Sequence, residues 1–487
     1  MLSPIFIISI LLIYFSVLIL IAKITQGNAS NESFFLGQRK SPWYIVAYGM
    51  IGATLSGVTF LSVPGMVKDG EFFYMQMVLG YVPGYLFVSF VLMPIYYKMK
   101  VYSIYEYLYH RFGYYSNKCG AGYFFLSRLL GASVRLYLVA LVLQELLFNQ
   151  LGLPFSITTL ITIALIWLYT YQGGIKTIIW TDTLQTTFML ATVCVCVLIL
   201  FQALDFSSIT DSLNQNLDVN IFSFSEFNNF NNFFRSFFSG MFIAIAMTGL
   251  DQDMMQKNLS CPNIYDAQKN MVIFSIVLVF VNFLFLYLGA LLYEYAFKYN
   301  IGIDGGDYLF VQVVNSGDLG VMVFVLFLLG LMSAAYSSAD SALTSLTTSF
   351  CIDFLATNNN KKPVSLTKRK SVHLFISFLL FCVILLVNHF NTNYSIINVL
   401  FGIAGYTYGP LLGLFMFGLF TKRQVIDRYV PLIVLVSPLL SYVLSKYDKI
   451  LLNGFNFSHD LIIINGGITF LFLYVFSKNG QSSNRVV

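Results

Sequence analysis

Charged residues are scarce in this sequence. Only 10% of its 487 residues are Asp, Glu, Lys or Arg, whereas 57% are hydrophobic. A typical soluble domain is about 25% charged and could not bury this much apolar surface in one core. The composition therefore excludes an ordinary soluble protein and indicates a chain that crosses a membrane many times.

The sequence also lacks the usual motifs of metalloenzymes and nucleotide-driven pumps. It contains four histidines and six cysteines, with no CxxC pair, no HExxH helix and no GxxxxGKS or GxxxxGKT loop. These absences exclude a zinc hydrolase and a P-loop pump, so we expect no enzyme activity. If the protein transports a solute against its concentration gradient, the gradient of another solute or ion must drive that transport. No basic stripe with interleaved aromatic residues suggests a nucleic-acid partner.

Long apolar runs dominate instead. About 20 apolar residues are needed to cross roughly 30 Å of hydrocarbon. Thirteen segments meet this requirement, near residues 3–22, 44–66, 73–97, 120–149, 154–171, 178–203, 234–256, 271–298, 308–354, 372–390, 394–420, 429–446 and 459–477. We therefore predict an all-α polytopic membrane protein with about 13 transmembrane helices. The first run has no basic segment before it and no close cleavage site, so we expect it to be a retained helix.

Basic residues predict the orientation. Placing the N-terminus outside puts twenty of the 27 Lys and Arg residues on the cytoplasmic side, among them Lys257 and the loop 361–370, and only four outside. Cytoplasmic loops carry the excess of Lys and Arg. We therefore predict a plasma (inner) membrane protein with an outside N-terminus and a cytoplasmic C-terminus.

The segment 328–350 is unusually polar for a membrane helix. Ser333, Ser337, Ser341 and Ser345 recur at every fourth position and form a stripe. Small-residue packing, with hydroxyls bonded back to their own helix, is one interpretation. Asp340 favours another, because a carboxylate in a membrane costs roughly 3 kcal/mol and usually faces a cavity, an ion or a partner charge. Clustered hydroxyl and carboxylate oxygens suit a hard cation such as sodium.

Two further features accompany this stripe. Asp182 follows the Gly173-Gly174 turn within another apolar segment, where an interfacial position near a helix N-terminus is the alternative. The segments 47–70 and 242–258 are rich in helix-weakening residues and predict interrupted helices. Paired interrupted helices at matching places in two halves indicate a transporter built from inverted repeats.

Four motifs carry a family resemblance. "GATLSGVTFLSVPG", "GGIKTIIWTDTLQ", "LDQDMMQKNLS" and "AAYSSADSALTS" occur in this order. Over roughly residues 35–425 the chain resembles the sodium:solute symporter family, which includes proline, sugar, sialic acid and iodide symporters. The resemblance implies a leucine-transporter-type fold with two inverted five-helix repeats and alternating access around a central site.

The same resemblance implies a division of the chain. An extra N-terminal helix and cytoplasmic loop occupy residues 1–40, the first repeat 41–205, an extracellular loop 206–232 and the second repeat 233–425. Two C-terminal helices and a short tail occupy residues 426–487.

The resemblance also assigns sodium ligands. The main site takes the carbonyls of Gly52, Leu55 and Ala334 and the hydroxyls of Ser337 and Ser338. Some members bind a second sodium, which here would use Asp182, Ser337, Asp340 and Ser341. Sialic acid symporters have a hydroxyl where this chain has Asp340, which leaves the sodium stoichiometry open.

The substrate residues that the resemblance implies come from several helices: Ser56, Thr59, Gln76, Arg135, Thr248 and Tyr406. The stretch "TLSGVTF" is most similar to the sialic acid symporters. The arginine that binds carboxylate in those proteins aligns with Gly131, one turn before Arg135. Pairing of Arg135 with Glu145 or Asp182, or snorkelling, is the alternative.

We predict a secondary active transporter that couples inward sodium movement to the uptake of a small, anionic organic solute. A neutral solute, such as a sugar, amino acid or vitamin, a channel and a transporter-like sensor are the alternatives. The expected partners are the solute, co-transported sodium and the lipid bilayer, and we expect the monomer to be functional.

Overall fold

The computed structural model describes residues 3–25, 31–69, 72–206, 220–229, 231–303, 306–316, 319–355, 364–390, 396–451 and 454–479. The helices of this part are α1 (Pro4–Thr25), α2 (Asn31–Leu36), α3 (Trp43–Thr54), α4 (Gly57–Gly65), α5 (Tyr74–Phe87), α6 (Met93–Met99), α7 (Glu106–Arg111), α8 (Tyr114–Leu143), α9 (Phe155–Ala203), α11 (Phe233–Ala244), α12 (Gln252–Leu259), α13 (Ile264–Lys298), α14 (Leu309–Asn315), α15 (Gly320–Ser349), α16 (Leu366–Phe390), α17 (Ile396–Phe420), α18 (Val430–Lys446), α19 (Asp448–Leu451) and α20 (Leu461–Val475). Two short strands, β1 (Gln424–Val425) and β2 (Ser477–Lys478), pair antiparallel.

Short helical turns of other types extend or join these helices. They are η1 (Gly37–Arg39), η2 (Met66–Asp69), η3 (Val88–Leu92), η4 (Gln144–Phe148), η5 (Ile245–Gly249), η6 (Gly306–Tyr308), η7 (Phe350–Leu355) and η8 (Asp427–Tyr429). Of the predicted outside loop, residues 207–219 and 230 lie outside the described residues, as do residues 361–363 of the basic loop.

In the described residues, all thirteen apolar segments coincide with helices, but the segment 308–354 forms two of them, α14 and α15, rather than one. In the described ranges, nine helices are long and apolar enough to cross a membrane, and the number rises to eleven when each of two bent pairs counts as one span. Two shorter apolar helices, Phe155–Tyr171 and Leu461–Val475, account for the remaining two segments. The predicted all-α polytopic fold is therefore confirmed.

Both predicted interruptions are present. α3 and α4 are bent by 58° where Leu55 and Ser56 leave the helical conformation. The helix formed by α11 and η5 is bent by 65° relative to α12. Asp251 lies in this second break and caps α12, because its Oδ1 accepts hydrogen bonds from the backbone N–H groups of Asp253 and Met254. Each half of the chain thus contributes one broken helix.

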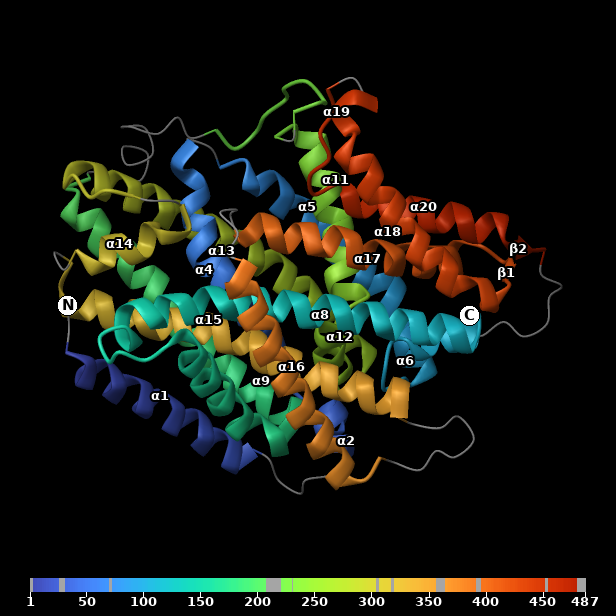
Figure 1. The fold of residues 1–487 in the computed structure, drawn as a ribbon, viewed down its shortest axis with the longest axis horizontal. Helices are drawn as coiled ribbons and strands as arrows, with labels where there is room; N and C mark the ends of the chain where they lie inside the picture. Colours follow the sequence, from blue (N-terminus) through green and yellow to red (C-terminus); the bar gives the residue numbers. More distant parts are fainter. Residues whose placement is uncertain are drawn as a thin grey trace.

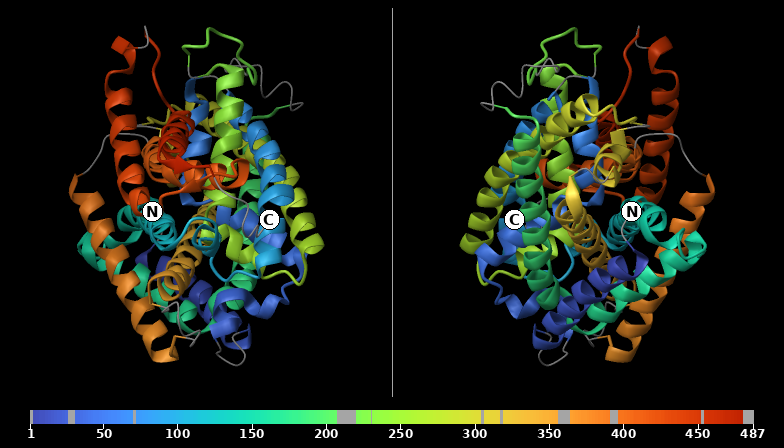
Figure 2. Two further views of the ribbon diagram at one scale, coloured as in Figure 1. Left: turned by 90° about the vertical axis from the view of Figure 1, so that its right-hand side faces the viewer. Right: turned by 90° about the vertical axis from the view of Figure 1, so that its left-hand side faces the viewer.

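Long helices pack around these breaks. α15 contacts α3, α4, α8 and α9, and Figure 1 shows α8 and α15 running side by side through the middle of the molecule. α1 lies on the outside against α9, and α17 packs against α20. The short helices α2 and α19, predicted on opposite sides of the membrane, lie at opposite ends of the molecule (Figures 1 and 2).

A sharp turn at Gly174 divides α9 into the two predicted spans. Its φ of 56° and ψ of −147° are readily adopted only by glycine. A Cβ atom there would also lie 2.5 Å from the Cα of Phe34, because α2 packs into the turn. The turn starts the second span, Gly173–Ala203, which carries Asp182 toward α15.

Candidate functional site

The polar stripe of α15 faces the protein interior. Every residue from Leu331 to Ser349 is buried, so the hydroxyls do not point to lipid. Some of them follow the packing interpretation, since Ser338 Oγ donates to the carbonyl of Ala335 at 3.1 Å and Ser345 Oγ to that of Ala342 at 3.0 Å. Ser337 differs, because its hydroxyl reaches across to another helix.

The α3–α4 break lies beside this stripe. A Cβ atom on Gly57 would contact the Cα of Ala335 at 3.7 Å. The N–H of Ser56 bonds the carbonyl of Thr54 at 3.1 Å and so leaves the carbonyl of Gly52 without its usual helical donor. Gly52, Leu55 and the Ala334 to Ser338 turn therefore come from two elements that the structure brings together. Backbone carbonyls freed in this way are typical ligands of sodium in broken membrane helices.

Close packing at Gly52 leads to a prediction. A Cβ atom there would overlap the Oγ1 of Thr186 on α9. We expect Gly52→Ala to lower the stability of the protein by about 1–3 kcal/mol, the usual cost of overpacking a core. Adding Thr186→Ala removes the overlapping oxygen, which is buried without a hydrogen-bond partner, and should restore part of the loss. Melting of the purified variants in detergent measures this, and an unchanged melting temperature for Gly52→Ala would contradict the close packing.

Asp182 is fully buried inside the protein. Its Oδ1 accepts a hydrogen bond of 2.6 Å from Ser337 Oγ, and its Oδ2 accepts one of 2.7 Å from Lys257 Nζ. Lys257 was counted among the cytoplasmic basic residues, and the structure shows that its side chain is not in an exposed loop: only 1% of it is exposed, and it lies on α12. Three helices, α9, α12 and α15, meet at this carboxylate.

Asp340 lies in the same electrostatic cluster. It lies close to Asp182 and Lys257, and its Oδ2 accepts a hydrogen bond of 2.9 Å from the hydroxyl of Tyr169 on α9. Its Oδ1 is buried and has no partner in the described part of the chain, and the same holds for the hydroxyl of Ser341. The predicted second-site residues are thus close together, but Asp182 already holds a cationic side chain.

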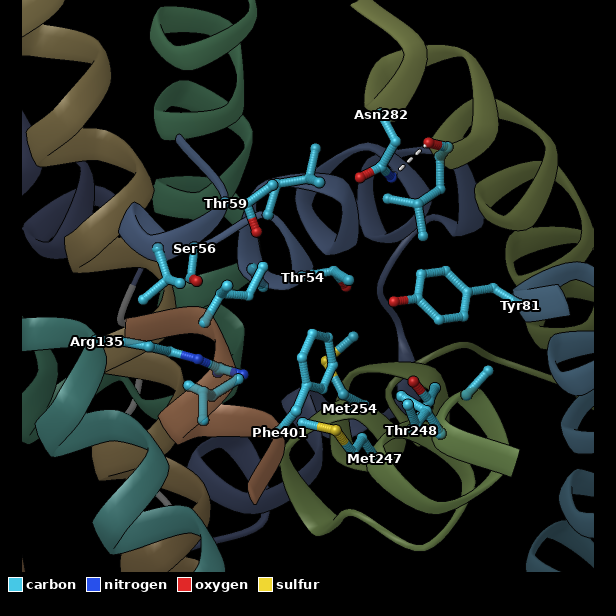
Figure 3. Close-up of a pocket in the computed structure, with 18 of the residues that line it drawn as sticks. Thr54, Ser56, Thr59, Tyr81, Arg135, Met247, Thr248, Met254, Asn282 and Phe401 are labelled. Carbon is cyan, nitrogen blue, oxygen red and sulfur yellow. Dashed lines mark hydrogen bonds between the residues drawn. The ribbon is translucent and has the colours of Figure 1, made fainter. Parts of the chain in front are cut away.

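A pocket of about 780 Å³, part of it open to solvent, lies at the other side of the α3–α4 break. Figure 3 shows Arg135 pointing into it from α8, with Ser56 and Thr59 on the broken helix and Tyr81 opposite. Met247, Met254 and Phe401 form an apolar wall. The lining residues are Ala53, Thr54, Leu55, Ser56, Val58, Thr59, Tyr74, Tyr81, Tyr85, Arg128, Arg135, Ile243, Ala244, Met247, Thr248, Met254, Leu278, Asn282, Ile397, Leu400 and Phe401.

Four of the six predicted substrate residues line this pocket: Ser56, Thr59, Arg135 and Thr248. Gln76 and Tyr406 do not line it. The amide of Gln76 is bonded to the loop before α11, donating to the carbonyl of Asn231 at 2.9 Å and accepting from the N–H of Ser223 at 3.0 Å. The hydroxyl of Tyr406 lies 2.8 Å from Ser445 Oγ on α18. The pocket is also lined by residues that the sequence analysis did not select: Tyr74, Tyr81, Tyr85 and Asn282.

Two arginines of α8 line the pocket, but only one is neutralised by an ion pair. Arg128 pairs with Asp253, and its Nη1 lies 4.0 Å from Asp251 Oδ2, which also accepts a hydrogen bond from Tyr408. This buried network joins α8 to α12 and α17 beside the pocket. It could not be predicted from the sequence, because the three helices involved are far apart along the chain.

Arg135 has no such partner. It is 9% exposed, its Nε is buried without a hydrogen bond, and no carboxylate of the described residues forms an ion pair with it. Of the two alternatives raised above, Glu145 is exposed and Asp182 is bound to Lys257 and Ser337. The nearby charge of Asp251 is shared with Arg128 and Tyr408. The pocket therefore contains a cation without a counterion among the residues that the structure describes.

This arrangement of broken helices, polar stripe and central pocket agrees with known proteins. The model of the sodium:solute symporter family matches residues 34–426, most of the chain. The chain belongs to the sodium:solute symporter family. It is therefore a sodium-coupled solute transporter and a multi-pass membrane protein rather than an enzyme, and solute and sodium are its transported substrates.

Individual relatives are distant in sequence. The sodium/sialic acid symporter NanT of Aliivibrio fischeri is 24% identical over 82% of this chain and 79% of its own length. SiaT of Proteus mirabilis, also a sodium/sialic acid symporter, is 23% identical over 82% and 81%. A solved substrate-bound, outward-open sodium-coupled sialic acid symporter superimposes with a TM-score of 0.80, covering 97% of this symporter and 99% of that chain at 20% identity. The predicted leucine-transporter-type fold is thus confirmed.

Proposed function

We propose that this symporter couples inward sodium movement to uptake of a small organic anion, and that Arg135 binds the carboxylate of that solute. The observation that carries the proposal is the Arg135 side chain, which is 9% exposed, lines the pocket and has no ion-pair partner among the described residues. An arginine stays protonated in proteins, and a buried charge without a counterion is costly. A carboxylate on the solute supplies the missing charge and fits the planar, two-donor geometry of the guanidinium.

The other residues of the pocket indicate which groups the solute carries besides its carboxylate. The hydroxyls of Ser56, Thr59 and Tyr81 face it from two sides, whereas Met247 and Phe401 offer apolar contact. A compact acid that also carries hydroxyl or amide groups would satisfy both kinds of contact. The relatives named as sialic acid symporters transport an acid, which supports this choice.

The sodium that drives the cycle is proposed to bind between the α3–α4 break and α15. Its ligands would be the carbonyls of Gly52, Leu55 and Ala334 and the hydroxyls of Ser337 and Ser338. Because the same broken segment lines the solute pocket through Ser56 and Thr59, an ion that orders this segment also orders half of the pocket. The solute and sodium sites are therefore coupled through α3 and α4. The direction of transport rests on the predicted outside N-terminus.

A thermal-shift experiment tests this function. Purified protein is melted with sialic acid, other small carboxylic acids, neutral sugars, amino acids and vitamins, each in sodium chloride and in potassium chloride. We expect an acid to raise the melting temperature in sodium and much less in potassium. Stabilisation by a neutral solute alone would contradict an anionic substrate, and equal stabilisation in the two salts would contradict coupling to sodium.

A further inference from the structure

The cation position beside Asp182 is already filled by a side chain. Both carboxylate oxygens of Asp182 are engaged, one by the hydroxyl of Ser337 at 2.6 Å and the other by the ammonium of Lys257 at 2.7 Å. Lys257 and Asp182 are 1% and 0% exposed as side chains, so water does not screen the pair. The ammonium brings one positive charge to the carboxylate, as a bound sodium ion would.

A sodium ion at the same carboxylate would have to displace this ammonium or lie next to it. Two positive charges a few ångströms apart repel strongly in a buried site. Displacement is equally unfavourable, because Lys257 is buried on α12 and would lose its buried counterion. The site assigned to a second sodium by the family resemblance therefore does not fit an ion while Lys257 stays in place.

We propose that Lys257 permanently takes the place of a second sodium ion at Asp182, so that this symporter binds one sodium ion per chain. The proposal rests on the sodium site of the proposed function, between the α3–α4 break and α15. The Lys257–Asp182 pair would then set the number of sodium ions coupled to each solute molecule. A symporter that couples fewer ions reaches a smaller solute gradient from the same sodium gradient.

Sodium counting with purified protein tests the proposal. Equilibrium dialysis with radioactive sodium, at saturating concentrations and without solute, gives the number of ions bound per chain. We expect one ion for the wild-type chain and two for Lys257→Met, which removes the ammonium and leaves the Asp182 carboxylate free. Lys269→Met serves as the matched control, because Lys269 is an exposed lysine on α13 and its loss should leave the count at one.

A structural ion pair without a role in ion binding predicts a different result. In that case Lys257→Met leaves a buried, uncompensated carboxylate, still binds one ion, and is destabilised to the same extent in sodium and in potassium. If the lysine stands in for sodium, sodium should raise the melting temperature of Lys257→Met more than that of the wild type. One bound ion in Lys257→Met would overturn the proposal.

The double variant Lys257→Met, Asp182→Asn keeps the test decisive if the single variant does not fold. It removes both charges together, so we expect it to fold and to bind one sodium ion as the wild type does. A double variant that folds and binds none would overturn the proposal, because Asp182 would then belong to the single sodium site.

A variant of Asp340 completes the experiment, since the Oδ1 of Asp340 lacks a partner in the described part of the chain and could bind a sodium ion. Two ions in the wild type that fall to one in Asp340→Asn would place a second sodium at Asp340 and overturn the proposal, while leaving the sodium-coupled function intact. A wild-type chain that binds no sodium at all would instead contradict the proposed sodium site. The two failures are thus distinguishable.

Discussion

Arg135→Ala is expected to weaken solute binding by about 30-fold or more while sodium binding persists. Truncating one partner of a buried charge pair costs about 2–5 kcal/mol, and each 1.4 kcal/mol is a factor of ten in affinity. Arg135 lines the pocket and has no carboxylate partner in the described residues, so the lost interaction is with the solute rather than with the protein. Isothermal titration of the purified variant with the solute identified by thermal shift, in sodium, measures the change.

Two comparisons sharpen this prediction. Arg135→Lys should recover only part of the affinity, because an ammonium cannot reproduce the two parallel hydrogen bonds of a guanidinium. The solute-free Arg135→Ala protein should melt at the wild-type temperature or above, since a buried charge without a counterion has been removed. Unchanged solute affinity, or a lower melting temperature that neutralising Glu145 or Asp182 restores, would show that the arginine serves the fold.

Ser337→Ala is expected to raise the sodium concentration for half-maximal transport by about 10-fold or more. The hydroxyl is a proposed sodium ligand and also donates to Asp182 at 2.6 Å. Hydrogen bonds to charged groups contribute about 1.5–3 kcal/mol, so losing this contact also disturbs the carboxylate behind the sodium site. Solute uptake into proteoliposomes at increasing sodium concentrations gives the value.

Ser345→Ala is the matched control for this variant. Ser345 belongs to the same stripe, is equally buried, and donates to the carbonyl of Ala342 on its own helix. Its removal should leave the sodium dependence unchanged. If Ser337→Ala and Ser345→Ala behave alike, the stripe of α15 serves packing and the proposed sodium site loses its main side-chain ligand.

The fold could be predicted from the sequence because its causes are local. Apolar runs long enough to cross a bilayer mark the helices, and Gly52 and Gly57 weaken one helix on either side of its break. The buried stripe of α15 follows from the four-residue spacing of its serines. The position of Asp182 within a span follows from the Gly173-Gly174 turn, which starts the helix that carries it.

The pairing of charges could not be predicted in this way. Counting basic residues assigned Lys257 to the cytoplasmic side, since the rule considers sequence position and not which carboxylate a lysine reaches. The family resemblance assigned Gln76 to the solute site. In the structure, its amide instead binds backbone groups of the loop before α11. Arg128, Asp253 and Tyr408 come from α8, α12 and α17, so only the packed helices bring them together.

The central claim, sodium-driven transport of an anion bound by Arg135, is tested most directly by uptake of a matched pair of solutes. Proteoliposomes receive the best-binding carboxylic acid or its primary amide, with an inward sodium gradient or with an equal potassium gradient. We predict concentrative uptake of the acid in sodium alone, and little uptake of the amide in either salt. Equal uptake of acid and amide, or uptake of the acid that does not depend on the sodium gradient, would contradict the claim.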